Sequence, residues 1–103
     1  MTNLIVLFNL RDGVDPRDYE SWAKSTDLPI VRALDSIKAF SVYRASGLLG
    51  SDESPPYQYV EIIGVGDMSR FGEEAASVTM QNVALEFRKY ADSPVFLITE
   101  SID

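Results

Sequence analysis

The chain has 103 residues, with 9 lysines and arginines against 16 aspartates and glutamates, and it contains neither cysteine nor histidine. This length fits one domain spanning residues 1–103. The two missing residue types exclude disulfides, thiolate nucleophiles, Cys/His zinc sites and histidine bases. A net charge of −7 repels nucleic-acid phosphates, and no apolar run approaches the roughly 20 residues that span a bilayer, so we expect neither partner. The N-terminus lacks a leader pattern, so we expect a cytoplasmic protein.

The first third of the chain predicts a strand followed by a helix. Residues 3–10 form an apolar run rich in bulky and β-branched side chains, and turn residues end it. Asp15 then provides a helix N-cap directly ahead of a proline. Because the residue before a proline resists the α conformation, we expect this helix to break near Leu28. Asp27 would then cap a second, short helical piece over residues 30–34.

The middle of the chain predicts two strands joined by a long loop. Residues 37–46 form the first of these strands, with Ile37 on the same face as Ala39, and residues 57–65 form the second. The loop between them, residues 47–56, combines two glycines with two prolines and is long for a hairpin. It could cover a cavity as a lid, or it could be a plain surface loop or an arm that reaches a second copy of the chain.

The last third predicts a long helix and a final strand. Asp67 caps this helix, which continues to the break at residues 92–94. Gly72 and the β-branched pair at residues 78–79 weaken or kink its middle. Residues 95–100 form the final strand. The order β-α-β-β-α-β predicts an α+β, ferredoxin-like fold, in which both helices lie on one face of a four-stranded antiparallel sheet.

Both faces of this sheet are apolar, although the helices can cover only one of them. In the first strand Leu4, Val6 and Phe8 point to one face, while Ile5 and Leu7 point to the other. The third and last strands show the same double pattern. An uncovered face of this kind exceeds the apolar patches that monomers usually expose. We therefore expect a homodimer in which the helix-free sheet faces pack together about a two-fold axis.

A chain of this length and element order, with both sheet faces apolar, resembles the dimeric α/β-barrel superfamily. Within that superfamily, residues 4–10, 15–23 and 37–44 resemble the RedY-like proteins of the HapK type. The resemblance implies a small homodimer that binds a heteroaromatic or polyketide-like intermediate in the biosynthesis of prodigiosin-type pigments, which are secondary metabolites. It also implies that the protein assists the condensation or cyclisation of this small aromatic ligand with no cofactor and no metal.

Two other functions stay open at this stage. The same superfamily contains cofactor-independent monooxygenases of quinols and phenols, and a protein of this kind can also bind a small ligand without any chemistry. Many members of the superfamily use a histidine, which this chain does not have. The sequence alone therefore leaves open whether the protein is an enzyme.

Three polar residues are candidates for catalysis. Glu61 lies in the middle of a strand that should be central, where burial raises the pKa of a carboxyl group toward acid–base use. Alternatively, Glu61 pairs with Arg44 or reaches solvent. Tyr59 supplies a hydroxyl for proton donation or hydrogen bonding. Asn9 ends the first strand and could orient a carbonyl or a pyrrole N–H, although such residues more often terminate a ladder or cap a turn.

Four further residues are candidates for contact with the ligand. Trp22 could stack on a flat ring, or it could anchor its helix in the core. Tyr19 and Tyr43 could donate hydrogen bonds to a ligand, although most tyrosines of this kind belong to a core or an interface. Arg44 could bind a carboxylate, or it could form a salt bridge at the end of its strand.

Overall fold

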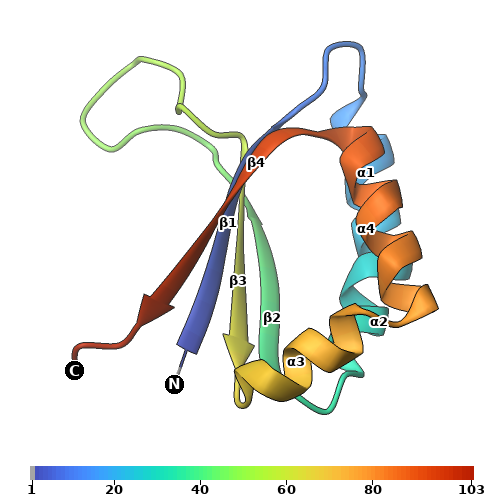
Figure 1. Ribbon diagram of the computed structural model, residues 1–103. Coiled ribbons are helices and arrows are strands. Elements are labelled where there is room, and N and C mark those ends of the chain that lie inside the picture. The colour runs from blue at the N-terminus through green and yellow to red at the C-terminus, as the bar shows by residue number, and fades with distance from the viewer. Residues whose placement is uncertain (1) are drawn as a thin grey trace.

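The computed structural model describes residues 2–103 and contains a four-stranded antiparallel sheet in the order β2-β3-β1-β4 (Figure 1). The strands are β1 (Thr2–Leu10), β2 (Ile37–Arg44), β3 (Tyr59–Val65) and β4 (Ala91–Glu100). The helices are α1 (Pro16–Trp22), the π-helix η1 (Ala23–Asp27), α2 (Leu28–Arg32), α3 (Met68–Ala75) and α4 (Val78–Tyr90), and all of them lie on one face of the sheet. This arrangement confirms the predicted ferredoxin-like order. Among residues 2–103, no helix has the length and apolar character needed to cross a membrane.

The first helical segment continues where we expected it to break. Asp15 forms the predicted N-cap, and its side chain accepts a hydrogen bond from the Arg17 backbone N–H at 2.9 Å. The prediction of a break near Leu28 is wrong, because this residue has helical dihedral angles of −58° and −51°. The wider π-helical turn η1 carries the chain from α1 into α2, and Pro29 is the second residue after this turn.

The second helical segment divides into two helices beside its β-branched residues. Asp67 accepts a hydrogen bond from the Arg70 backbone N–H at 3.1 Å, which confirms the predicted cap of α3. The chain then leaves the helix after Ala75, and Ser77 caps α4 by accepting a bond from the Met80 N–H at 3.2 Å. The interruption therefore lies just before the predicted weak point at residues 78–79.

Two β-bulges change the predicted strands. One lies between Ile37 and Ala39 in β2, so that Ile37 turns to the helix-covered face instead of sharing the face of Ala39 as predicted. The other lies where β4 shifts register against β1, near Ser93, which has a positive φ of 47°. Strand β4 consequently begins at Ala91, four residues earlier than predicted.

The core packs between the helices and the sheet face that they cover, and it leaves part of that space open. Phe8 lies at its centre, with its ring centroid 5.4 Å from that of Tyr19, 5.5 Å from Tyr59 and 4.9 Å from Phe87. These aromatic contacts join β1 and β3 to α1 and α4. Two of these rings, Tyr19 and Tyr59, also line the candidate site described below.

The opposite face of the sheet carries the apolar surface that the sequence predicted. Ile5 pairs with Ile62 on one side and with Leu97 on the other, and Leu7 pairs in the same way with Val60 and Val95. Side chains opposite one another in a sheet share a face, so we define these residues as the helix-free patch, namely Ile5, Leu7, Val60, Ile62, Val95 and Leu97. No helix lies over this patch in Figure 1.

The long loop between β2 and β3 extends away from the helices (Figure 1). Its side chain Leu49 is fully exposed, and an isolated bridge joins Leu48 to Ser51 near its tip. Because the loop projects on the side of the sheet that lacks helices, it does not cover the space between sheet and helices. This position argues against a lid for that space.

Candidate functional site

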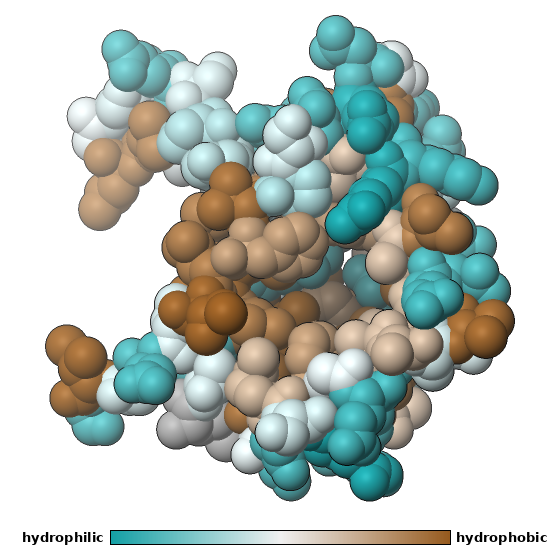
Figure 2. Space-filling model, in the orientation of Figure 1, coloured by the Kyte–Doolittle hydropathy of each residue, from teal (hydrophilic) through white to brown (hydrophobic). Residues whose placement is uncertain are grey.

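The space between the sheet and the helices is hollowed, and Figure 2 shows this hollow with apolar surface along its strand side. Two pockets of about 220 Å³ and about 200 Å³ occupy it. The first pocket, which we name the outer pocket, is lined by residues of α1, η1, α2, β2 and β3, namely Tyr19, Glu20, Ala23, Lys24, Leu28, Val42, Arg44 and Tyr59. The second, the inner pocket, extends toward α3, α4 and β4.

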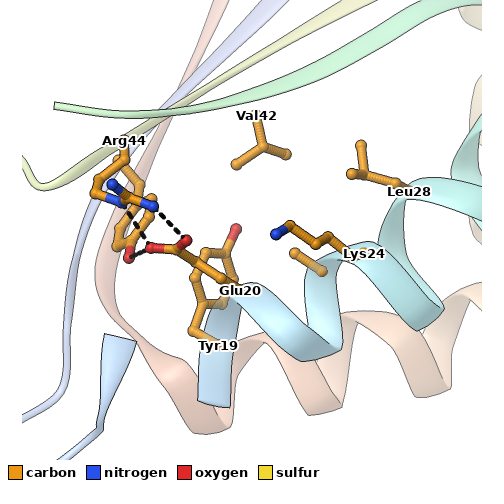
Figure 3. Close-up of a pocket in the computed structure, with 8 residues that line it drawn as sticks. Tyr19, Glu20, Lys24, Leu28, Val42 and Arg44 are labelled. Carbon is orange, nitrogen blue, oxygen red and sulfur yellow. Dashed lines mark hydrogen bonds and ion pairs between the residues drawn. The ribbon is translucent and has the colours of Figure 1, made fainter. Parts of the chain in front are cut away.

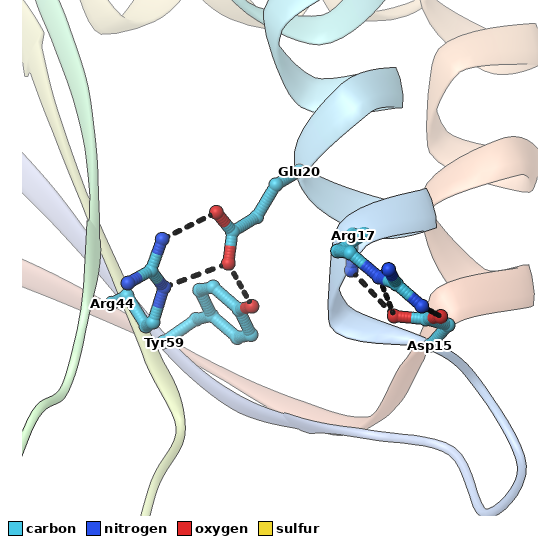
Figure 4. Close-up of polar contacts among 5 residues, drawn as sticks. All are labelled: Asp15, Arg17, Glu20, Arg44 and Tyr59. Atoms are coloured by element: carbon cyan, nitrogen blue, oxygen red, sulfur yellow. Dashed lines mark hydrogen bonds and ion pairs between the residues drawn. The ribbon is translucent and has the colours of Figure 1, made fainter.

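The outer pocket contains a charge-balanced network (Figure 4). Arg44 donates two hydrogen bonds to the carboxylate of Glu20, at 2.8 Å and 2.7 Å, and the Tyr59 hydroxyl donates a third at 2.7 Å. The bonds from Arg44 and then Tyr59 lower the pKa of Glu20 to about 2. This carboxylate is therefore ionised and fully paired across the neutral pH range.

Other residues of the outer pocket surround this network (Figure 3). The Tyr19 hydroxyl points into the pocket, as does the amino group of Lys24, while Val42 and Leu28 provide apolar walls. The pocket thus combines an open, partly charged mouth with an apolar interior.

The inner pocket contains two buried carboxyl groups. Glu61 comes from β3 and Asp27 from η1, and each residue is only 5 % exposed. The Tyr19 hydroxyl donates a hydrogen bond to Glu61 at 3.4 Å. Within residues 2–103, neither carboxyl group forms an ion pair, and Arg88 is the one cationic side chain that lines this pocket. The walls are largely apolar, with contributions from Val31, Phe40, Ile63, Phe71, Ala75, Met80, Val83, Ala84, Phe87 and Phe96.

Burial changes the protonation of these two groups. It raises the pKa of Asp27 to about 7. Burial together with the nearby charge of Asp27 raises the pKa of Glu61 to about 8, although the Tyr19 hydrogen bond opposes this change. The pKa of Tyr19 also rises, chiefly through burial. Around neutral pH the pair therefore retains at least one proton, so it can both donate and accept a proton.

The structure brings four of the seven sequence-predicted residues together. Glu61 lines the inner pocket, and Tyr59 and Arg44 line the outer pocket. Tyr19 lines the outer pocket and donates a hydrogen bond to Glu61, so it connects the two pockets. The alternative in which Glu61 pairs with Arg44 or reaches solvent is wrong, because Glu20 holds Arg44 and the helices bury Glu61.

The other three predicted residues lie away from both pockets. Asn9 is held at the base of the loop, where its amide donates to the Pro56 carbonyl at 3.0 Å and its oxygen accepts from the Gln58 N–H at 2.9 Å. Tyr43 is 55 % exposed and shares the helix-free face with Val60, its partner across β3. Neither residue can reach a ligand held between the sheet and the helices.

Trp22 packs between helices and lines neither pocket. Its indole N–H donates to Glu86 of α4 at 2.9 Å, and its ring centroid lies 5.4 Å from that of Tyr90. The core-anchor interpretation of Trp22 therefore fits this position, and the stacking interpretation does not.

Sequence reasoning missed three residues of the two pockets. Asp27 was interpreted as a helix cap, but its side chain makes no cap hydrogen bond and turns into the inner pocket instead. Glu20 and Lys24 directly follow the buried residues Tyr19 and Ala23, and they lie four residues apart, so they share the helical face that adjoins the buried one. A helical projection of this segment places both of them beside the buried tyrosine, which is the signal that could have found them.

Comparison with protein families identifies the chain. The family model described as REDY-like protein HapK matches residues 2–102, which is nearly the whole sequence. The chain belongs to this family. A comparison with curated proteins gives no significant match.

Solved structures with the same fold include a member of this HapK family. The crystal structure of HapK from Hahella chejuensis is 27 % identical, with a TM-score of 0.81 over 99 % of this chain and 93 % of that one. A mutant of SnoaB, a cofactor-independent oxygenase from Streptomyces nogalater, is 15 % identical, with a TM-score of 0.78 over 99 % and 93 %. A dimeric ferredoxin-like protein of unknown function from Thermobifida fusca is 15 % identical, with a TM-score of 0.76 over 97 % and 90 %. At these identities, the last two show the fold alone.

Proposed function

We propose that this HapK-family protein is a homodimer that binds a flat heteroaromatic or polyketide-like intermediate between its sheet and its helices. It assists the condensation or cyclisation of that intermediate in the biosynthesis of a prodigiosin-type pigment or a related secondary metabolite. The observation that carries this proposal is the inner pocket, in which two carboxyl groups that form no ion pair within residues 2–103 lie within apolar and aromatic walls.

A buried carboxyl group without a cationic partner reduces the stability of a fold, so such a group is expected where function needs it. The apolar walls suit the body of a flat ring, and carboxyl groups suit its N–H or O–H donors. Glu61 is the group that we assign to acid–base chemistry. In its protonated form it can donate a proton to an oxygen that leaves as water when an aldehyde condenses with a pyrrole carbon.

Tyr19 and the outer pocket assist this chemistry in our proposal. The Tyr19 hydroxyl, 3.4 Å from Glu61, orients the carboxyl group and supports its ionised form after the proton has left. The Tyr59, Glu20 and Arg44 network holds the mouth of the outer pocket in a fixed shape. In this scheme Tyr59 positions the site and contributes no proton to the reaction.

Assembly through the helix-free patch completes the proposal. The side chains of Ile62, Val95 and Leu97 are 38 %, 37 % and 42 % exposed in the isolated chain. The residues paired with them in β1 are also apolar, so the exposed apolar surface is continuous. Burying such a surface against its own copy is favourable by roughly 25 cal/mol per Å² before association is counted. The loop that carries the exposed residue Leu49 extends on the same side of the sheet and would reach the second copy as an arm. A structural relative is itself described as dimeric.

The catalytic part of the proposal is tested with a pyrrole carbaldehyde and an alkylpyrrole, whose condensation releases water and gives a coloured dipyrromethene. We expect the protein to accelerate colour formation, and Glu61→Gln to abolish most of the acceleration. Oxygen uptake is followed in parallel with a panel of quinols. Rapid uptake without pyrrole condensation would favour the monooxygenase alternative and overturn our assignment, as would tight binding of the probes with no reaction.

The dimer is tested by sedimentation of two variants that introduce the same charge. Leu97→Glu places a carboxylate in the helix-free patch, whereas Leu85→Glu places it at an exposed position of α4, outside the patch. We expect the native protein and Leu85→Glu to sediment as dimers at micromolar concentration, and Leu97→Glu to sediment as a monomer. A native monomer under the same conditions would overturn the dimer.

A further inference from the structure

Asp27 is the least satisfied polar side chain of the inner pocket. It is 5 % exposed, it lines the cavity, and its raised pKa has burial as its cause, with no hydrogen bond from the described residues to offset it. Its neighbour Glu61 differs, because Glu61 already accepts a hydrogen bond from Tyr19. Burial reduces the contact of this carboxyl group with water, and the described residues give it no hydrogen bond to offset that loss.

The backbone that carries Asp27 is itself unusual. Asp27 is the last residue of η1, a π-helical turn in the middle of a helical segment, and such turns occur often at functional sites. The extra residue of a π-turn rotates the positions that follow it around the helix axis. The segment could have used Asp27 as a cap for α2, but the side chain makes no such bond.

The geometry points to Asp27 as the residue that determines which ligand the inner pocket accepts, by taking a hydrogen bond from the N–H group of a neutral or cationic nitrogen heterocycle. This inference rests on the proposed function, since it requires that a heteroaromatic ligand enters the pocket. The inference adds two points to that function: Asp27 selects the ligand, and the property that it selects for is a ring N–H donor.

The composition of the pocket supports this class of ligand. Walls such as Phe40, Ile63 and Phe87 accept a flat apolar body, and a volume of about 200 Å³ is below the roughly 300–1,000 Å³ of sites for drug-sized molecules. One or two rings therefore fit. The two carboxyl groups are the main polar contacts, so an anionic ligand would add further negative charge to a buried site, and among residues 2–103 the exposed Arg88 is the one lining cation that would oppose it. A ring N–H instead provides the donor that Asp27 lacks.

The test compares indole with benzofuran, in which an oxygen replaces the ring N–H, by chemical-shift titration of the full chain. For the native protein we expect indole to bind about tenfold more tightly, which corresponds to one hydrogen bond to a charged acceptor. Indole carboxylate should bind more weakly than indole. In Asp27→Leu the preference for indole should disappear, while Asp27→Asn, which keeps an acceptor, should retain part of it. Asp52→Leu, in the exposed loop, is the matched control and should change nothing.

Thermal unfolding separates a ligand contact from a structural role. Because the part of the chain that the structure describes gives the Asp27 carboxyl no hydrogen bond, we expect Asp27→Leu to raise the melting temperature at mildly alkaline pH. A lower melting temperature in both Asp27 variants, or an unchanged preference for indole in Asp27→Leu, would overturn this inference and leave the proposed function standing. If the native protein bound neither indole nor the pyrrole probes, the proposed function would fail, and this inference would fail with it.

Discussion

The protein contains two glutamate–tyrosine pairs a short distance apart, and their surroundings give them opposite properties. In the outer pocket Tyr59 donates to Glu20 at 2.7 Å, and Arg44 completes the network with two further bonds. In the inner pocket Tyr19 donates to Glu61 at 3.4 Å, and no cation pairs with that carboxyl group within residues 2–103. The chemical groups are the same, but only in the second pair does the carboxyl group keep its proton near neutral pH.

The comparison shows that burial and charge partners decide the role of each pair. The pKa of Glu20 falls to about 2 because the bonds from Arg44 and Tyr59 stabilise its ionised form. The pKa of Glu61 rises to about 8 because the helices remove water and Asp27 adds a negative charge. When two like groups have pKa values moved in opposite directions, the one moved toward neutrality is the candidate for proton transfer. We therefore propose a structural role for Glu20 and a role in proton transfer for Glu61.

The largest effect is expected when each glutamate is replaced by glutamine. Loss of a general acid typically lowers a rate by about 10²–10⁴, so Glu61→Gln should slow pyrrole condensation by at least about 100-fold. Glu20→Gln should stay within about threefold, because its carboxylate does not reach the inner pocket. Initial rates are measured on samples whose folding is checked by circular dichroism. Equal losses in the two variants would show that the difference between the pairs has no catalytic meaning.

The pH dependence of stability should show the same contrast with opposite slopes. The carboxyl groups of Glu61 and Asp27 ionise near 4.5 and 3.8 when unfolded, but near 8 and 7 when folded. Their contribution to stability is complete at pH values below the unfolded pKa and is lost as the pH rises through the folded pKa. Glu20 behaves oppositely, since its contribution is present above 4.5 and disappears as the pH falls toward 2.

Urea unfolding at a series of pH values measures these two slopes. We expect the free energy of unfolding to fall by several kcal/mol between about pH 5 and about pH 9, because each carboxyl group contributes about 1.4 kcal/mol per pH unit between its unfolded and folded pKa values. The double variant Asp27→Asn and Glu61→Gln should flatten this alkaline decline, while Glu20→Gln should leave it in place and weaken the acid decline. An alkaline decline that persists in the double variant would show that other groups cause it.

Sequence reasoning succeeded where local pattern decides the outcome. The order of the elements, the caps at Asp15 and Asp67 and the two apolar sheet faces all follow from periodicity and turn residues. The faces of Ile37 and the start of β4 were wrong, because a β-bulge depends on how neighbouring strands meet and leaves little trace in one strand.

The site was harder to predict, because its partners come from distant parts of the chain. Glu61 was recognised by its charge in a central strand, and Arg44 was a reasonable partner, since both side chains lie on the helix-covered face of adjacent strands. The helix then placed Glu20 closer to Arg44, and no local pattern shows which of the two carboxylates wins. Asp27 precedes Leu28 and Pro29, a context typical of a cap, and only the π-turn reveals that its side chain enters the pocket.

A smaller effect is expected when each tyrosine loses its hydroxyl, and it should separate stability from chemistry. Tyr59→Phe removes a short bond to an ionised carboxylate and should reduce the free energy of unfolding by about 1 kcal/mol at neutral pH. Tyr19→Phe removes a longer bond and should cost less stability. It should, however, raise the pKa of Glu61 further, because the lost bond favoured the ionised form. The pH optimum of the condensation rate should then be higher for Tyr19→Phe than for the native protein. Tyr59→Phe should leave this optimum unchanged.

The smallest effect is expected from Arg44→Gln, which removes the cation of the outer network. The Arg44 side chain is 66 % exposed, so water and salt screen its ion pair with Glu20, and we expect only a slight loss in the free energy of unfolding. Because Tyr59 still donates to Glu20, the network should survive in reduced form, and the difference from the native protein should shrink further in high salt. Urea unfolding at low and high salt measures this. A large loss of unfolding free energy that does not depend on salt would mean that Arg44 acts as a buried structural partner. Screening by water would then not explain why the outer network differs from the inner pocket.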